Sequence, residues 1–431
     1  MSSATWAMPL RAILVNPDRG FTGFRRCEHG LASDRSVRQC LQRPHRVVRV
    51  GVAAVSSRLP AVRPWYQLGM WMRGRTILAV VVLVAAACGS GGGGDDAGAP
   101  PPDEPAASEE RDGRDAGRED DRGGGADDGE GDGTGVPAGV GEDAWTTLTE
   151  APLALSEVGV AAFDGELWVA GGLSGDGGVT PMVQVYDPAA DRWRDGPELP
   201  EPVHHASLVA TDSELVLMGG YRTLAFDPVA DVFVLDQAND AWVEAPDLPE
   251  ARGAGAGAWD GERLVFAGGV GPDGLADDVW ALDDVTGGQW SETGQLSIAR
   301  DHLAATSDGD GNVWFLAGRE NSLVANLGTV DLLSGDRIEP IGEMPTPRGG
   351  VGAFSSQRHG ACVAGGEQPD GTFAEVECIT ADGETTSLPG LSSPRHGVGA
   401  AAIAGVAYVA LGGPDPGLAV SGTLEALRVD Q

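Results

Sequence analysis

The fold is decided by a short pattern that first occurs at residues 164–172, which read DGELWVAGG. The pattern returns at 212–220 as DSELVLMGG and at 260–269 as DGERLVFAGG. In each copy, an Asp-containing turn precedes a short apolar run that ends at a pair of glycines. Such turns join the strands of hairpins, and short continuous apolar runs are typical of strands buried on both faces. The pattern therefore predicts repeated β-hairpins.

The small-residue pair recurs six times at nearly constant spacing. The pairs are Gly171-Gly172, Gly219-Gly220, Gly268-Gly269, Ala317-Gly318, Gly365-Gly366 and Gly412-Gly413, at spacings of 48, 49, 49, 48 and 47 residues. Alternating strand-like segments follow the pairs, and Trp returns at positions 145, 193, 242 and 290. Each unit thus contains about four strands. Repeated four-stranded units of this length predict a β-propeller, a ring that leaves no long sheet edge exposed.

The ends of the repeat region predict how the ring closes. Trp145 occupies a fourth-strand position with no other strand of its unit before it. The sixth unit ends at Gln431 after only three strands. We therefore expect residues 143–149 to supply the missing strand of the last blade. The fold class predicted for residues 143–431 is all-β, a six-bladed propeller closed by its N-terminal strand.

The repeat resembles the kelch repeat. The shared features are the glycine pair, the Tyr186-Asp187-Pro188 segment, the Trp about seven residues later, and a Leu-Pro-type link to the next unit. The resemblance covers 143–431 and weakens after Trp290, because the later units lack the fourth-strand Trp and one has Ala317 for the first glycine. It implies a propeller that binds its ligand at the mouth of the central channel.

Three segments of different composition precede the propeller. Residues 1–71 are rich in Arg and lack periodicity, and we expect a mis-called or disordered extension. Residues 72–88 have the layout of a secretory signal, with two Arg before an apolar stretch too short to span a membrane. Residues 89–142 are rich in Gly, Asp and Glu with almost no bulky apolar side chain, which predicts a disordered acidic linker.

Cys88 follows three alanines and resembles the lipobox of bacterial, actinobacterial-like lipoproteins. The resemblance implies that Cys88 is lipidated and that the protein is exported and anchored to the outer face of the cell membrane. The alternative is an ordinary signal peptide or membrane anchor with a coincidental Cys.

Charge and composition exclude several function classes. The 431 residues include 29 basic and 64 acidic side chains, giving a net charge of −35. A nucleic-acid partner is excluded, since binding phosphates requires a concentrated basic surface. Five Cys are too few for a disulfide scaffold.

One position at the start of each first strand suggests a ligand site. Its occupants are Leu155, Val203, Arg252, Arg300, Arg348 and Arg395. We expect the four Arg to meet at one side of the channel mouth, beside His204, His205, His302 and His396. Guanidinium groups suit carboxylates, sulfates and phosphates. The alternative is a structural role, in which each Arg binds loop carbonyls or acidic residues. The His residues lack metal-ligand spacing, so neither a metal nor a cofactor is predicted.

The predicted function is binding rather than catalysis: a monomeric, surface-anchored protein engages a protein or anionic glycan through the propeller mouth. The alternative is a carbohydrate-active enzyme, because the kelch resemblance extends to sialic acid mutarotases and, less closely, to galactose oxidase. Cys362 and Cys378 fall on neighbouring strands of the fifth unit. The sequence allows two alternatives for these residues: a disulfide between them, or two separate buried thiols.

Overall fold

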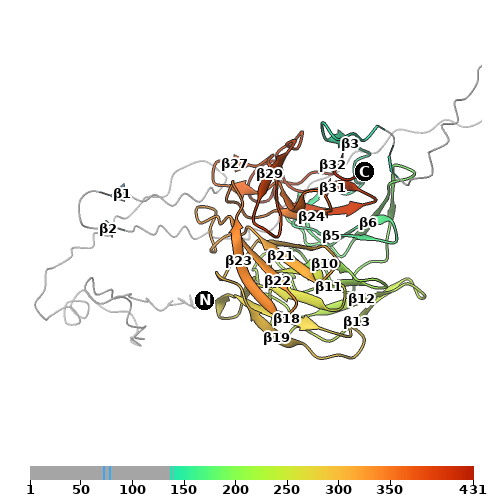
Figure 1. Cartoon of the computed structure of the whole chain (residues 1–431). Helices are drawn as coiled ribbons and strands as arrows, with labels where there is room; N and C mark the ends of the chain where they lie inside the picture. The colour runs from blue at the N-terminus through green and yellow to red at the C-terminus, as the bar shows by residue number, and fades with distance from the viewer. Residues whose placement is uncertain (1–70, 73–76, 79–135, 138) are drawn as a thin grey trace, which may run out of the picture. The chain divides into compact units, whose positions relative to one another are not determined.

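The computed structural model describes residues 71–72, 77–78, 136–137 and 139–431 (Figure 1). The chain divides into two compact units, Met1–Gly117 and Arg118–Gln431. The first contains β1 (Trp71–Met72), which pairs antiparallel with β2 (Ile77–Leu78). The predicted extension, signal segment and linker, including Cys88, lie almost wholly outside the described residues. Within the described ranges, no helix is long and apolar enough to cross a membrane.

The second unit is a ring of six antiparallel four-stranded sheets, the blades, each ordered from the channel outward (Figure 1). Blade 1 contains β5 (Gly159–Phe163), β6 (Glu166–Ala170), β8 (Val183–Asp187) and β9 (Arg192–Asp195). Blade 2 contains β10 (Ser207–Ala210), β11 (Leu215–Met218), β12 (Val232–Asp236) and β13 (Ala241–Glu244). Blade 3 contains β14 (Ala256–Trp259), β15 (Leu264–Ala267), β18 (Asp278–Leu282) and β19 (Ser291–Gln295).

The remaining blades follow the same order. Blade 4 contains β20 (Ala304–Ser307), β21 (Asn312–Leu316), β22 (Thr329–Ser334) and β23 (Arg337–Glu343). Blade 5 contains β24 (Gly352–Ser356), β25 (Gly360–Ala364), β28 (Val376–Ile379) and β29 (Thr385–Leu388). Blade 6 contains β30 (Gly399–Ile403), β31 (Val406–Ala410), β32 (Leu424–Arg428) and β3 (Thr146–Thr147). Three two-stranded pairs lie in the loops: β4 (Leu155–Ser156) with β7 (Leu173–Ser174), β16 (Val270–Gly271) with β17 (Gly274–Leu275), and β26 (Glu367–Gln368) with β27 (Gly371–Thr372).

The N-terminal strand closes the ring. In β3, Thr146 pairs with Ala426 and Thr147 with Glu425 of β32, so the first strand of the repeat region is the outer strand of the last blade. The neighbouring Trp145 is buried, and its indole N–H donates to the Pro389 carbonyl at 2.7 Å. The predicted six-bladed, all-β propeller with this closure is confirmed.

The glycine pairs connect adjacent blades. The second residue of each pair donates its N–H to a carbonyl at the start of the next blade, as from Gly172 to Val203 at 2.8 Å. A Cβ at Gly171 would lie only 2.4 Å from that carbonyl oxygen, which explains the small residue. In blade 6 the equivalent donor is Gly412, which bonds Leu155 at 2.9 Å. The sixth pair is therefore Leu411-Gly412, and its assignment to Gly412-Gly413 was wrong by one residue.

The apolar core lies between neighbouring blades and inside them. Side chains of blades 1 and 2 form one continuous cluster that includes Trp168 and Leu217. Within blade 5, Cys362 and Cys378 are direct neighbours on β25 and β28 and are joined by a disulfide. Outer-strand Trp residues also tie blades together: the indole N–H of Trp242 donates to the Pro197 carbonyl at 2.9 Å.

Candidate functional site

The four Arg that the sequence placed at the channel mouth are buried inside the blades. Each is at most 3% exposed and forms an ion pair with a carboxylate on the third strand of its own blade. The closest N···O distances are 2.9 Å for Arg252–Asp278, 2.7 Å for Arg300–Asp331, 2.5 Å for Arg348–Glu377 and 2.8 Å for Arg395–Glu425. The cavity at the channel mouth is lined by other residues.

The other two blades lack the Arg and also lack a carboxylate at the register position of Asp331, Glu377 and Glu425. In blade 3 the carboxylate is Asp278, two residues before that position. In blade 1, Leu155 replaces the Arg, and Gln184 occupies the register position that Glu425 holds in blade 6. The Gln184 amide accepts from the Leu153 N–H at 2.8 Å and donates to its carbonyl at 3.0 Å. In blade 2, Val203 replaces the Arg, and Phe233 replaces the carboxylate. The burial of each Arg against a carboxylate of its own blade favours the structural role for the Arg, of the two roles that the sequence left open.

The channel mouth is built by the residues two positions after the Arg. They are Glu157, His205, Ala254, His302, Gly350 and Gly397, all in the left-handed backbone region with φ between 51° and 71°. Each donates its N–H to the carbonyl of its equivalent in the preceding blade, at 2.8 to 3.1 Å, and the six bonds close on themselves. All six residues line a cavity of about 80 Å³. A closed ring of backbone bonds fixes where each side chain enters the channel.

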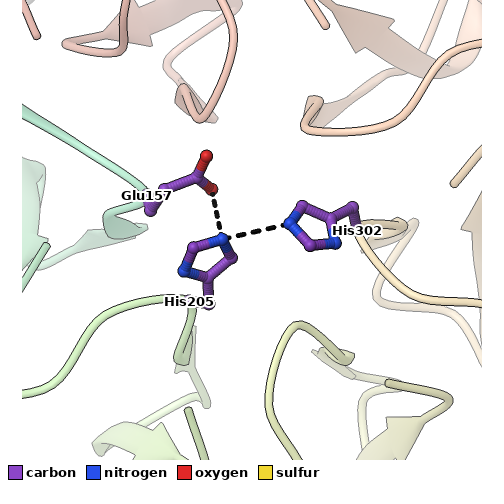
Figure 2. Close-up of side chains that lie close together, drawn as sticks. All are labelled: Glu157, His205 and His302. Atoms are coloured by element: carbon purple, nitrogen blue, oxygen red, sulfur yellow. Dashed lines mark hydrogen bonds and ion pairs between the residues drawn. The ribbon is translucent and has the colours of Figure 1, made fainter. Parts of the chain in front are cut away.

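Only three of the six blades place a functional side chain in this ring. Glu157, His205 and His302 carry one, while the other three positions are Ala or Gly. The His205 Nε2 atom lies 3.1 Å from the Glu157 Oε2 atom and 3.1 Å from the His302 Nε2 atom (Figure 2). Small residues opposite leave the space that these side chains share. We call the three residues the channel triad.

Arg319, which follows the small-residue pair of blade 4, joins the triad to further acids. Its Nη2 atom lies 2.7 Å from His302 Nε2, its Nη1 atom 2.8 Å from Glu367 Oε1, and its Nε atom 3.5 Å from Asp301 Oδ1. A guanidinium can only donate hydrogen bonds. In this arrangement the Nε2 atom of His302 is therefore an acceptor and carries no proton.

The two remaining His residues flank the triad. His204 Nδ1 lies 2.6 Å from His205 Nδ1, and His204 Nε2 lies 3.1 Å from the Thr223 carbonyl. His396 has one ring nitrogen at 3.1 Å from the Gly413 carbonyl and the other at 3.0 Å from the Gly417 carbonyl. His396 is thus held between two backbone carbonyls.

Burial sets the protonation of the central imidazole. It lowers the pKa of His205 well below the usual range, and the neighbouring His302 and His204 lower it further. Burial likewise lowers the pKa of His204, and it raises the pKa of the Tyr221 phenol beside them. A buried group avoids its charged form unless a partner compensates. His205 is thus neutral at neutral pH and can act as a base or as a metal ligand.

The structure brings together the four predicted His residues and separates them from the four predicted Arg. The sequence reasoning missed Glu157, Asp301, Arg319 and Glu367, which complete the site. A signal was available for Glu157 and Asp301, because several equivalent positions are Ala or Gly. Arg319 and Glu367 gave no such signal, since their equivalents include Leu173, Tyr221 and Val270. The sequence also gave no metal-ligand spacing, because the clustered residues come from different blades.

Comparison with known proteins agrees with the fold. The kelch motif family matches residues 154–200. The chain is 34% identical to "Kelch-like protein terF" of Aspergillus terreus over 91 residues, which are 19% of this chain and 20% of that protein. It is 34% identical over 82 residues to "Kelch repeat and BTB domain-containing protein 13" of Homo sapiens, covering 18% of each. The chain thus spans a fifth or less of the length of these relatives.

A solved structure resembles this chain over most of its length. The protein described as "Structure of YjhT" superposes with a TM-score of 0.54, covering 64% of this chain and 95% of that one. At 15% sequence identity, this likeness shows the fold alone. Together with the six glycine-linked blades, the matches show a six-bladed β-propeller that contains a kelch motif at residues 154–200 and is similar to kelch-repeat proteins.

Proposed function

We propose that the protein binds a protein or carbohydrate ligand through the mouth of the propeller channel. The observation that carries this is the convergence of Glu157, His205 and His302 on one cavity, from three separate blades. The fold does not need these side chains, because Ala or Gly serves at the equivalent positions of the other blades. Polar groups converging in a concave site are typical of ligand recognition.

The charges of the mouth favour a ligand that presents a cation or hydrogen-bond donors. Three carboxylates lie at the mouth, those of Glu157, Asp301 and Glu367, and the last two face the single guanidinium of Arg319. The four Arg expected to attract an anionic glycan are already paired with carboxylates inside their blades. We therefore favour a basic peptide segment or an uncharged sugar over an anionic glycan.

Peptide and glycan arrays with cationic, neutral and anionic members test this proposal. Glu157→Gln keeps the side-chain shape and removes the charge, and we expect about 10-fold weaker binding of the captured ligands, the effect of losing one charged hydrogen bond. Glu244→Gln on the exposed outer strand β13 is the matched control and should bind as wild type. Anionic ligands that bind Glu157→Gln and wild type equally would contradict the proposal.

A second candidate is acid–base catalysis on a small carbohydrate, of the sialic acid mutarotase type. The 3.1 Å contact between Glu157 and the neutral imidazole of His205 favours it, since a paired carboxylate and imidazole can move a proton. Magnetisation-transfer NMR on reducing sugars, sialic acid included, measures anomeric exchange directly. His205→Asn should slow it by about 10²–10⁴-fold. Anomeric exchange no faster than in buffer would rule out catalysis and leave ligand binding as the proposed function.

The cellular placement we propose is the outer face of the bacterial membrane, with the acidic linker holding the propeller away from it. It is supported by the signal-like segment 72–88 and its Cys. Mass spectrometry of the native protein should find an N-terminal, lipidated Cys88, and Cys88→Ser should release the protein from the membrane fraction. Peptides from residues 1–69 in the native protein would contradict this placement.

A further inference from the structure

The channel triad has the spacing of a metal site. Two imidazole nitrogens lie 3.1 Å apart, and a carboxylate oxygen lies 3.1 Å from one of them. The candidate donor atoms of Glu157, His205 and His302 all lie within 4.8 Å of one another. Ligands at the zinc bond lengths of 2.0–2.1 Å on a tetrahedron are separated by about 3.3 Å. An ion at the centre therefore requires only small side-chain movements.

Both His side chains are held so that Nε2 points into the cavity. His302 Nδ1 faces the Asp301 carboxylate at 3.4 Å and has no hydrogen-bond partner at shorter range among the described residues. His205 Nδ1 contacts His204 at 2.6 Å. A carboxylate or another polar group behind the distal nitrogen is the usual arrangement for a metal-binding His, because it fixes the tautomer and the ring orientation. This feature is independent of the spacing of the donor atoms.

The charge of the cluster suits a dication. With neutral imidazoles, the three carboxylates of Glu157, Asp301 and Glu367 outnumber the single guanidinium of Arg319 by two charges. In the buried mouth this imbalance is compensated by protonated imidazoles or by a bound cation. The two imidazole donors select a transition ion over Ca²⁺ or Mg²⁺, which prefer oxygen ligands. The adjoining cavity of about 80 Å³ leaves room for a water as fourth ligand.

From these observations we infer that Glu157, His205 and His302 bind a divalent first-row transition-metal ion, for which Zn²⁺ is the probe. The site is of the three-ligand type that keeps a coordination position open toward the channel. This inference does not depend on which ligand the mouth binds. Arg319 competes with the ion, because its guanidinium occupies the Nε2 atom of His302. On metal binding it gives up that contact and keeps its ion pair with Glu367.

Calorimetric titration of the chelator-treated full chain with Zn²⁺ measures the site. His205→Asn and His302→Asn should each lose one bound equivalent of Zn²⁺ or raise the Kd for Zn²⁺ by more than about 100-fold. Changes outside the ligand shell reach about 100-fold at most, so a larger loss identifies a ligand. Asn tolerates the left-handed backbone of both positions. His359→Asn, in the turn between β24 and β25, is the matched control and should titrate as wild type. Equal stoichiometry and affinity in all four proteins would overturn the inference.

Two further variants separate metal binding from a folding defect. Arg319→Gln removes the competing guanidinium and should bind Zn²⁺ more tightly than wild type, an effect that misfolding cannot produce. Glu157→Gln should weaken binding and change the visible spectrum of bound Co²⁺, because one ligand is lost. Weaker binding in Arg319→Gln, or a Co²⁺ spectrum unchanged in Glu157→Gln, would show that the ion binds elsewhere.

Discussion

Arg300 and His302 lie two residues apart at the start of blade 4, yet they serve different parts of the molecule. Arg300 is fully buried and paired with Asp331 inside its blade, as are its equivalents in blades 3, 5 and 6. His302 points into the channel, where the equivalent positions are mostly different residues. Positions that most repeats share therefore hold the blades together. The candidate site is built at positions where the repeats differ.

Breaking the buried pair gives the largest effect. Arg300→Met leaves the Asp331 carboxylate buried without its partner, and we expect the free energy of unfolding to fall by about 3–5 kcal/mol. The double variant Arg300→Met, Asp331→Leu should recover most of this loss, because no charge is then left unpaired. His302→Asn should cost only about 1 kcal/mol, the scale of a hydrogen bond. Urea denaturation measures all three, and a similar loss for Arg300→Met and His302→Asn would break the comparison.

The disulfide is an exception to this comparison. It is structural, although it occurs in blade 5 alone among the described blades. It joins Cys362 and Cys378, both fully buried, across 16 residues of chain. A loop of this size predicts a stabilisation of about 3 kcal/mol. Unfolding curves with and without reductant should differ by this amount. Coincident curves, with free thiols verified by alkylation after unfolding, would show that the bridge contributes nothing.

A smaller expected effect is the pH dependence of the free energy of unfolding that His205 causes. Burial lowers the pKa of His205 below the 6.5 of an exposed His, so acid protonates the unfolded chain preferentially. The stability contribution is therefore complete above pH 6.5 and is lost as the pH falls. Going from about pH 7.5 to about pH 5.5 should cost about 1 kcal/mol for this residue. With chelator present, urea unfolding of His205→Asn should show a smaller loss than wild type; an equal loss would contradict the assignment.

Only part of the candidate site could be predicted from the sequence. All four His residues were identified, because they follow the Arg position by one or two residues. The role of the Arg could not be decided, since a recurring cation fits a ligand site and a buried pair equally well before its partner is located. The partners Asp331 and Glu425 lie 31 and 30 residues further along the chain. Only the register of the third strand showed that they face the Arg.

Sequence alone was enough to predict the six-bladed ring, its closure by residues 143–149 and the four-stranded blade. These follow from local features, because turns, apolar runs and close-packed glycines act over a few residues. Which polar residues meet depends on how the blades are arranged in space. His205 and His302 are 97 positions apart, and they touch because the ring turns equivalent positions of blades 2 and 4 toward one axis. Contacts across a closed ring depend on every blade between them, so no short stretch of sequence contains them.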